Sequence, residues 1–145
     1  MLGKKCSDVM TRHLTCCTPG DTVHVVAQSM KAQGVGAMPV IDSHEQKHVM
    51  GIVTDRDLAM KVVAEGLDSR KTKVEDVMSR KMVMCKIDDD WQVALDAMAK
   101  HQVRRIPVVN DQGRIEGIIS QADVAIRIEE PEATAKVVEE ISRAA

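Results

Sequence analysis

The chain has 145 residues and a net charge of −2 at neutral pH, so its composition does not indicate a basic surface for nucleic acid. It contains one Trp and no Phe or Tyr, which argues against aromatic platforms that stack single-stranded bases. No apolar run approaches the roughly 20 residues needed to cross a bilayer, and the N-terminus lacks a secretory signal, so we expect a cytoplasmic protein without membrane contact.

The first half of the chain predicts two helices around a β-hairpin. In chain order we expect a helical turn at 7–10, an extended stretch at 15–17, a helix from 23 to the glycines at 34 and 36, strands at 37–41 and 48–53, and a helix from 54 to about 65. Asp21 or Thr22 is a suitable N-cap for the first helix, and Thr54 for the second.

The second half predicts the same order of elements after a polar linker. In chain order we expect the linker at 67–73, an extended stretch at 83–86, a helix from Asp90, strands at 105–109 and 114–119 around a tight turn, and a helix that opens at Ser120. Pro131 is well placed for the first turn of a further helix, for which later apolar residues provide one face.

Three short motifs occur twice in the same order. Asp8-Val9-Met10 recurs as Asp76-Val77-Met78, and Met38-Pro39-Val40 recurs as Ile106-Pro107-Val108, both 68 positions later. The segments 51–57 (GIVTDRD) and 117–123 (GIISQAD) are 66 positions apart, so the two copies differ by a small indel in a turn. We therefore divide the chain into a first repeat at 1–66, a linker at 67–73, a second repeat at 74–128 and a C-terminal helix at 129–145. A repeat of about 60 residues is marginal as an independent core, so the two are expected to pack as one body.

This repeated pattern resembles the CBS domain pair, also called a Bateman module, from about Cys6 to Arg127. The stretches 54–57 (TDRD) and 101–105 (HQVRR) look like those of small stand-alone bacterial pairs of the hypoxic response type. The resemblance implies an α/β (α+β) fold of two βαββα repeats packed as one pseudo-twofold module. It also implies a regulatory module without catalytic residues, and two chains that associate through their helices as a homodimer. The effector protein is unknown.

In that family, the Thr or Ser and the Asp of the Gly-φ-φ-[Thr/Ser]-x-x-Asp segment bind an adenosine-type ligand in the cleft between the repeats. The matching residues are Thr54 with Asp57 and Ser120 with Asp123. A carboxylate can accept hydrogen bonds from ribose hydroxyls, and the family's ligands are AMP, ADP, ATP, NAD and S-adenosylmethionine. The same spacing is also a capping box, in which these side chains only close the end of a helix. Both interpretations stay open at this point.

Further residues are candidates for the same sites. Arg56, Arg104 and Arg105 are candidate partners of phosphate. By resemblance, the adenine slot would be lined by the segments that contain Cys17, Ala37, Met38, Cys85 and Ile106. The first site has Gly36-Ala37 where the second has Arg104-Arg105, so we expect the second to prefer a phosphate-bearing ligand.

Cys17 and Cys85 are equivalent under the 68-residue offset, so we also consider that they approach one another. They would then form a thiol pair that senses redox state or holds a soft metal. Alternatively, they are reduced thiols that serve only as small residues of the core. The histidines show no metal-site spacing, and no metal or required cofactor is expected. A further alternative is a dimeric, stress-related interaction protein whose ligand sites are vestigial.

Overall fold

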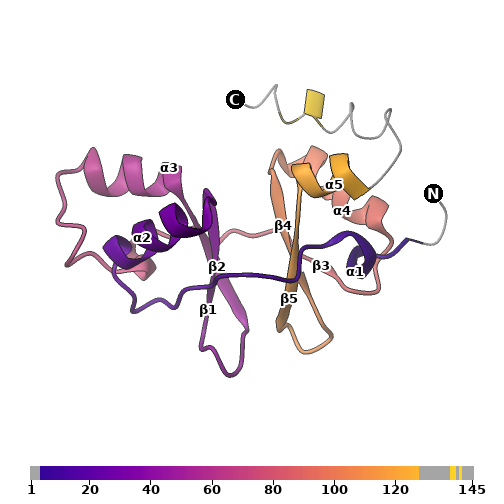
Figure 1. The fold of residues 1–145 in the computed structure, drawn as a ribbon, viewed down its shortest axis with the longest axis horizontal. Coiled ribbons are helices and arrows are strands. Elements are labelled where there is room, and N and C mark those ends of the chain that lie inside the picture. The colour runs from indigo at the N-terminus through magenta and orange to yellow at the C-terminus, as the bar shows by residue number, and fades with distance from the viewer. Residues whose placement is uncertain (1–3, 128–137, 140, 142–145) are drawn as a thin grey trace. The chain divides into compact units, whose positions relative to one another are not determined.

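The computed structural model describes residues 4–127, 138, 139 and 141. Its backbone packs as two compact units, each of which contains helices and strands (Figure 1). The repeat-1 unit comprises Thr15–Met82, and the repeat-2 unit comprises Met1–Leu14 together with Val83–Ala145. The mixed helix-and-strand class predicted from the sequence is confirmed.

The repeat-1 unit is built on a two-stranded antiparallel hairpin with its helices packed against it. Its elements are α2 (Val23–Gln33), β1 (Ala37–Ile41), β2 (Val49–Thr54), α3 (Asp55–Leu58), the π-helix η1 (Ala59–Val63) and the 3-10 helix η2 (Val74–Asp76). In Figure 1, α2 and α3 lie beside one another next to this hairpin. The expected extended stretch at 15–17 is reduced to one parallel bridge between Cys17 and Val40.

The repeat-2 unit has the same order of elements with a third, short strand. Its elements are α1 (Cys6–Val9), β3 (Cys85–Lys86), α4 (Trp91–His101), β4 (Arg105–Val109), β5 (Ile115–Ser120) and α5 (Gln121–Arg127). Strand β3 is parallel to β4, and β4 is antiparallel to β5. The predicted βαββα order is therefore complete in the repeat-2 unit, whereas the repeat-1 unit has a single bridge at Cys17 in place of the first strand.

Local side chains explain where the two long helices begin and end. The Thr22 hydroxyl accepts a hydrogen bond from the first turn of α2, and the Asp90 carboxylate does the same for α4. Helix α2 ends at Gly34, which has a φ of +66°. Helix α4 ends in the same left-handed conformation at Gln102, with a φ of +55°, where the sequence has no glycine.

The helix expected from Thr54 to about Glu65 is not a single α-helix. After α3, the amide of Ala64 donates to the carbonyl of Ala59 at 2.9 Å, which is the wider hydrogen bond of a π-helix. This wider turn forms η1 and includes Lys61, a residue that contacts the candidate site.

The segment that opens each repeat packs on the hairpin of the other repeat. Thr11 exchanges two backbone hydrogen bonds with Ile118 of β5, and Ser79 exchanges two with Ile52 of β2. The compact units therefore do not coincide with the sequence intervals 1–66 and 74–128. These intervals stay a prediction of the two repeats. Most of the predicted C-terminal helix at 129–145 lies outside the described residues, but Ile141 is buried in the core of the repeat-2 unit.

The two cores are made of aliphatic side chains, methionines and cysteines. Trp91, the only aromatic residue of the chain, is buried in the core of the repeat-2 unit. Within the part of the chain that the structure describes, no helix has the length and apolar character needed to cross a membrane.

Candidate functional site

The candidate site of the repeat-1 unit lies where β2 ends and α3 begins. The amide of Thr54 donates to Oδ2 of Asp57 at 2.9 Å, and the Thr54 hydroxyl donates to the same oxygen at 3.1 Å. In return, the Asp57 amide lies 3.1 Å from the Thr54 hydroxyl oxygen, which accepts from it. The pair forms a complete capping box, so its structural role is present.

The repeat-2 unit has the same arrangement where β5 ends and α5 begins. The amide and the hydroxyl of Ser120 donate to Oδ2 of Asp123 at 2.9 and 3.0 Å. The Asp123 amide donates to the Ser120 hydroxyl at 3.2 Å. The two sites thus share one local geometry although one uses Thr and the other Ser.

The second oxygen of each carboxylate faces a different donor in the two units. Oδ1 of Asp57 lies 3.1 Å from the ammonium group of Lys61, which also donates to the carbonyl of Val77 at 2.9 Å. Oδ1 of Asp123 accepts a 2.7 Å hydrogen bond from the hydroxyl of Thr11. Capping therefore uses one oxygen of each carboxylate and leaves the other for a further donor, since a carboxylate has about four acceptor positions.

Sequence reasoning missed both Thr11 and Lys61. Lys61 lies one helical turn after Asp57, a spacing at which opposite charges pair, so this contact could have been anticipated. Thr11 directly follows the first Asp-Val-Met motif, as Ser79 follows the second, but its partner lies 112 positions away in the sequence.

The hairpin register decides which residues lie beside each capping box. Ala37 is the partner of Thr54 across the β1–β2 pair, and Arg105 is the partner of Ser120 across the β4–β5 pair. The predicted contrast between a small residue in one site and an arginine in the other is therefore present in the pairing.

The residue before each of these strands is also joined to the start of the following helix. The carbonyl of Gly36 accepts from the amide of Asp55 at 2.9 Å, and the carbonyl of Arg104 accepts from the amide of Gln121 at 3.0 Å. A Cβ atom at Gly36 would lie 2.8 Å from a side-chain oxygen of the exposed Asp55, so a larger residue there would require the Asp55 side chain to shift.

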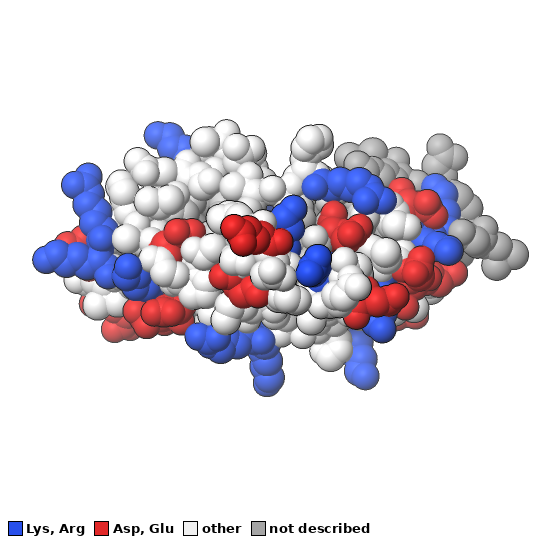
Figure 2. Space-filling model, turned by 90° about the horizontal axis from the view of Figure 1, so that it is seen from below, with Lys and Arg blue, Asp and Glu red and all other residues white. Residues whose placement is uncertain are grey.

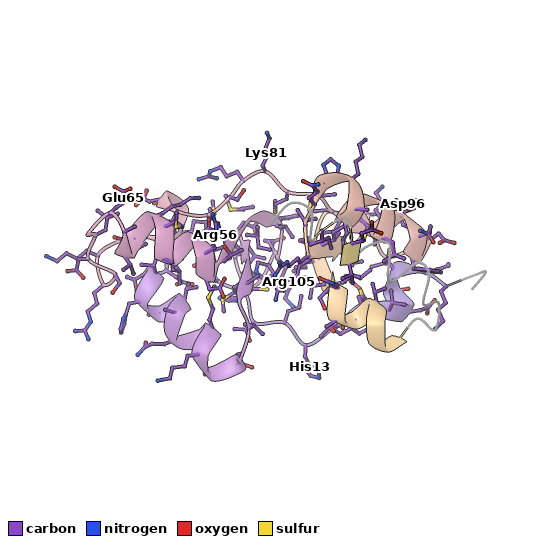
Figure 3. The ribbon with its side chains drawn as sticks, turned by 90° about the horizontal axis from the view of Figure 1, so that it is seen from above. His13, Arg56, Glu65, Lys81, Asp96 and Arg105 are labelled. Carbon is purple, nitrogen blue, oxygen red and sulfur yellow. The ribbon has the colours of Figure 1, made fainter. Side chains whose placement is uncertain are left out.

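The three arginines predicted as phosphate partners lie near the two boxes. Arg56 is exposed in the first turn of α3, directly between the residues of the Thr54–Asp57 box. Arg104 is exposed and Arg105 is half-buried at the start of β4 (Arg56 and Arg105 are labelled in Figure 3). Arg56 thus lies on the helix that carries Asp57, whereas Arg104 and Arg105 lie at the start of the strand that pairs with the one leading to Asp123.

The residues predicted to line an apolar slot have their side chains in the cores. Met38 and Cys17 belong to the core of the repeat-1 unit, and Ile106 and Cys85 to that of the repeat-2 unit. Ala37 is also buried. Their contact with an adenine ring stays a prediction, and in the described conformation it would involve backbone atoms.

The cysteines form one thiol contact, which does not involve Cys17. Cys17 lies in the repeat-1 unit, where its thiol is 3.7 Å from the carbonyl oxygen of Pro39 and burial raises its pKa to about 12. In the repeat-2 unit, Cys85 hydrogen-bonds to Cys6, which raises the pKa of Cys85 and lowers that of Cys6. The approach of Cys17 to Cys85 stays a prediction, and the thiol neighbour of Cys85 is Cys6.

The repeat explains why only one unit has a thiol pair. The amide of Cys6 donates to Asp89 and the amide of Val74 donates to Asp21, each at 2.8 Å, so Val74 occupies the place of Cys6. The 68-residue offset relates Cys6 to Val74 and Asp21 to Asp89, so the sequence shows that the repeat-1 unit has no cysteine at the position of Cys6.

Charged groups give no large area of one sign on the face shown in Figure 2, where basic and acidic side chains are interspersed. Among the residues that the structure describes, no cluster of three or more His, Cys, Asp or Glu side chains is arranged to hold a metal ion.

Comparison with known proteins identifies the family. A model of the CBS domain matches residues 6–64 and 74–130. The chain belongs to the CBS domain family. It is a tandem CBS pair, and each Thr/Ser–Asp box lies in one of the two matched segments.

Similar proteins include other CBS pairs of comparable length. CBS domain-containing protein YhcV of Bacillus subtilis is 38% identical over 119 residues, which are 82% of this chain and 81% of YhcV. Hypoxic response protein 1 of Mycobacterium tuberculosis is 32% identical over 123 residues, 85% of this chain and 84% of that protein. The predicted resemblance to this type of CBS pair is confirmed.

Solved structures show the same fold. The crystal structure of Hypoxic Response Protein I with two coordinated zinc ions has a TM-score of 0.78 at 30% identity, covering 86% of this chain and 99% of that one. A CBS domain pair crystallised with 5′-methylthioadenosine and S-adenosyl-L-methionine has a TM-score of 0.73 at 22% identity, covering 84% and 93% of the two chains. A signal-transduction protein with CBS domains from Burkholderia ambifaria has a TM-score of 0.69 at 31% identity, covering 82% of this chain and 87% of that one. The tandem CBS pair is a module of this regulatory type.

Proposed function

We propose that this CBS pair is a regulatory module that binds an adenosine-containing nucleotide at Asp57 and at Asp123. The candidates are AMP, ADP, ATP, NAD and S-adenosylmethionine. The observation that carries the proposal is that the two oxygens of each carboxylate have different partners. Oδ2 closes the helix end, and Oδ1 is held in a fixed direction towards an additional donor.

A ribose hydroxyl is a donor of the same kind as the Thr11 hydroxyl that Asp123 already accepts. Binding of a ribose therefore does not require the capping box to open, since the box uses the other oxygen. The capping and ligand roles of these residues are therefore compatible, as the sequence interpretation allowed.

Cationic groups beside the boxes support a phosphate-bearing ligand. Lys61 and Arg56 provide positive charge at the Asp57 site, and Arg104 and Arg105 at the Asp123 site. An arginine can bind phosphate through two parallel hydrogen bonds, so we expect the Asp123 site to favour phosphorylated adenosines more strongly. The adenosine compounds crystallised with a CBS pair of the same fold support the ligand class.

The test is thermal unfolding of the protein, followed by the fluorescence of the buried Trp91, against each candidate nucleotide. A ligand at about 100 times its Kd stabilises the folded state by about 2.7 kcal/mol, which corresponds to a rise in Tm of about 5–10 °C. Replacement of Asp57 and Asp123 by Asn together should abolish the shift. Asp55→Asn removes a neighbouring exposed charge outside the box and is the matched control.

If none of the nucleotides changes the Tm, the proposal is contradicted. That result would favour the alternative of a dimeric interaction protein whose ligand sites are vestigial. A shift that survives in the double variant would place the ligand elsewhere. Because Asn retains one acceptor oxygen, each substitution is expected to cost only about 1 kcal/mol of helix capping, which urea unfolding measures separately.

We further propose that the chain forms a homodimer through its helices, acts on an unidentified effector protein in the cytoplasm, and has no catalytic activity. Exposed apolar side chains on and after η1 support the dimer, namely those of Met60, Val63 and Leu67. A hexameric CBS-CP12 protein of bloom-forming cyanobacteria has a related fold, with a TM-score of 0.75 at 26% identity, which supports association of CBS pairs.

Cys6 and Cys85 are free thiols buried in the same core, which favours a second candidate function, a thiol redox sensor. Two thiols that lose two protons and two electrons to a diazene oxidant such as diamide would form one disulfide, and the oxidant would become a hydrazine. Non-reducing peptide mapping after diamide treatment should find Cys6 linked to Cys85. Cys6→Ser should abolish the link and Cys17→Ser should retain it. A Cys17–Cys85 link instead would restore the pair expected from the sequence.

A further inference from the structure

The strongest unassigned feature is the hydrogen bond between the segment that opens the chain and the carboxylate of Asp123. The Thr11 hydroxyl donates to Oδ1 of Asp123 at 2.7 Å, and both side chains are half-buried. This distance is typical of a hydroxyl bound to a charged oxygen, which is stronger than a bond between neutral groups.

The backbone holds Thr11 in place for this contact. The amide of Thr11 donates to the carbonyl of Ile118 at 2.8 Å, and the amide of Ile118 donates back at 3.1 Å. Met10 and the carbonyl of Thr11 lie directly over Gly117, where a Cβ atom would be 2.5 Å from the Met10 sulfur and 2.9 Å from that carbonyl oxygen. The hydroxyl is thus positioned by β5, which also leads to Ser120.

The repeat-1 unit provides an internal comparison. Ser79 is held by Ile52 through the same two backbone hydrogen bonds, at 2.9 and 3.0 Å. Its hydroxyl nevertheless donates to the carbonyl of Lys81 at 3.4 Å, and Oδ1 of Asp57 pairs with Lys61. The opening segment therefore provides a donor to the candidate ligand oxygen at Asp123 but not to the one at Asp57.

We propose that Thr11 is a regulatory residue that competes with a ribose hydroxyl for Oδ1 of Asp123. This inference rests on the proposed function, because it concerns the regulation of the same site. A nucleotide bound at Asp123 displaces the Thr11 hydroxyl and weakens the attachment of the opening segment, residues 4–14, to β5. At Asp57 the competing donor is instead the ammonium group of Lys61 on η1, which can keep its hydrogen bond to the carbonyl of Val77, so occupancy there leaves the equivalent segment at Ser79 in place.

The competition predicts that removal of the Thr11 hydroxyl strengthens binding. In an Asp57→Asn background, which leaves one candidate site, Thr11→Val should bind AMP about tenfold more tightly by isothermal titration calorimetry. Thr11→Ser keeps the hydroxyl and should match the background protein. Because the effect acts through ribose hydroxyls, it should vanish for 2′,3′-dideoxy-AMP, which a merely structural role of Thr11 would not predict.

A second readout follows the opening segment itself. Saturating AMP should accelerate hydrogen exchange of the Thr11 and Ile118 amides in the Asp57→Asn protein, and Ser79 in wild-type protein should show no such change. Tighter binding in Thr11→Val, or AMP binding that is measurable only in that variant, supports the competition.

AMP binding that changes less than twofold in Thr11→Val would overturn the inference and leave the proposed function standing. If AMP binds to none of the wild-type protein, the Asp57→Asn protein and its Thr11→Val variant, the proposed function and the competition by Thr11 are both rejected for this nucleotide. Urea midpoints of all variants show whether the fold is retained, and Thr11→Ala replaces Thr11→Val if the latter does not fold.

Discussion

The side chain of Met10 lies where a Cβ atom of Gly117 would be, and Met78 has the same relationship to Gly51. In each pair, the opening segment of one repeat closes over a strand of the hairpin in the same compact unit. The glycine allows the two backbones to approach. A Cβ atom would lie 2.9 Å from the carbonyl oxygen of Thr11 at Gly117, and 2.7 Å from that of Ser79 at Gly51.

Replacement of either glycine by alanine should therefore destabilise its unit. Inserted methyl groups in a packed region typically cost about 1–3 kcal/mol, and Gly51→Ala should cost at least as much as Gly117→Ala because it meets backbone more closely. Urea unfolding followed by circular dichroism measures this. Gly20→Ala, with no atom within 4 Å of the added Cβ, is the control and should be near neutral. Equal stabilities of all three variants would contradict the close approach.

The carboxyl group of Asp42 should titrate below its ordinary range. The ring of His48 lies 2.8 Å from it, and the backbone amides of His48 and Ser43 donate to its other oxygen, so these bonds lower its pKa. A lowered pKa means that the contribution to stability is present above the ordinary value of about 3.9 and is lost as the pH falls through the native pKa.

Carbon-13 NMR titration of the Asp42 carboxyl group tests this expectation. In His48→Ala the pKa should rise towards the ordinary value, because the ring contact is lost. An unchanged Asp42 pKa would show that the ring contact is absent in solution.

The four cysteines should react unequally with a thiol reagent such as Ellman's reagent. Cys6, Cys17 and Cys85 are buried, whereas Cys16 is half-buried. Burial raises the pKa of Cys16 as well, so its reaction should be slow near neutral pH and accelerate as the pH rises. Cys16→Ser should remove the fastest phase, and all thiols should react rapidly in denaturant. A fast phase that persists in Cys16→Ser would show that the opening segment exposes Cys6 readily.

The sequence predicted much of this fold because its signals are local. The bounds of strands 37–41 and 105–109 were predicted to the residue. Each is a short apolar segment that is followed by a polar turn, and the first also follows a glycine. Thr22 was one of the two candidate caps for α2, and α4 was expected to begin at Asp90; the structure has these residues as the N-caps. The left-handed end of α4 at Gln102 carries no glycine signal and was not predicted.

Long-range contacts were not readable in this way. The pairing of Thr11 with Ile118, and of its hydroxyl with Asp123, joins segments more than a hundred residues apart. The sequence therefore identified the carboxylates of the candidate site, but not the donors that now occupy their second oxygens. The π-helical turn of η1 was likewise not predicted. It forms because a backbone amide bonds to the carbonyl five residues earlier instead of four, and the spacing of apolar residues does not distinguish the two.

The exposed valine at the end of η1 offers a direct test of the proposed dimer. The side chain of Val63 is 76% exposed in the single chain, and those of Met60 and Leu67 are about half exposed. Burial of these side chains against a second copy would be favourable by about 25 cal/mol per Å² of apolar surface, and a charge at position 63 would oppose it. Val63→Asp should therefore weaken self-association by tenfold or more in sedimentation velocity experiments.

Met84→Asp provides the matched control, because Met84 is 44% exposed but lies in the extended segment before β3 and not on a helix. It should associate as the wild-type chain does. A monomeric wild-type chain at high concentration would reject the dimer. Equal association of both variants would move the interface away from η1. Since a charge on an exposed side chain leaves the core unchanged, Val63→Asp should keep its urea midpoint when measured at monomer concentrations, which separates loss of the interface from loss of the fold.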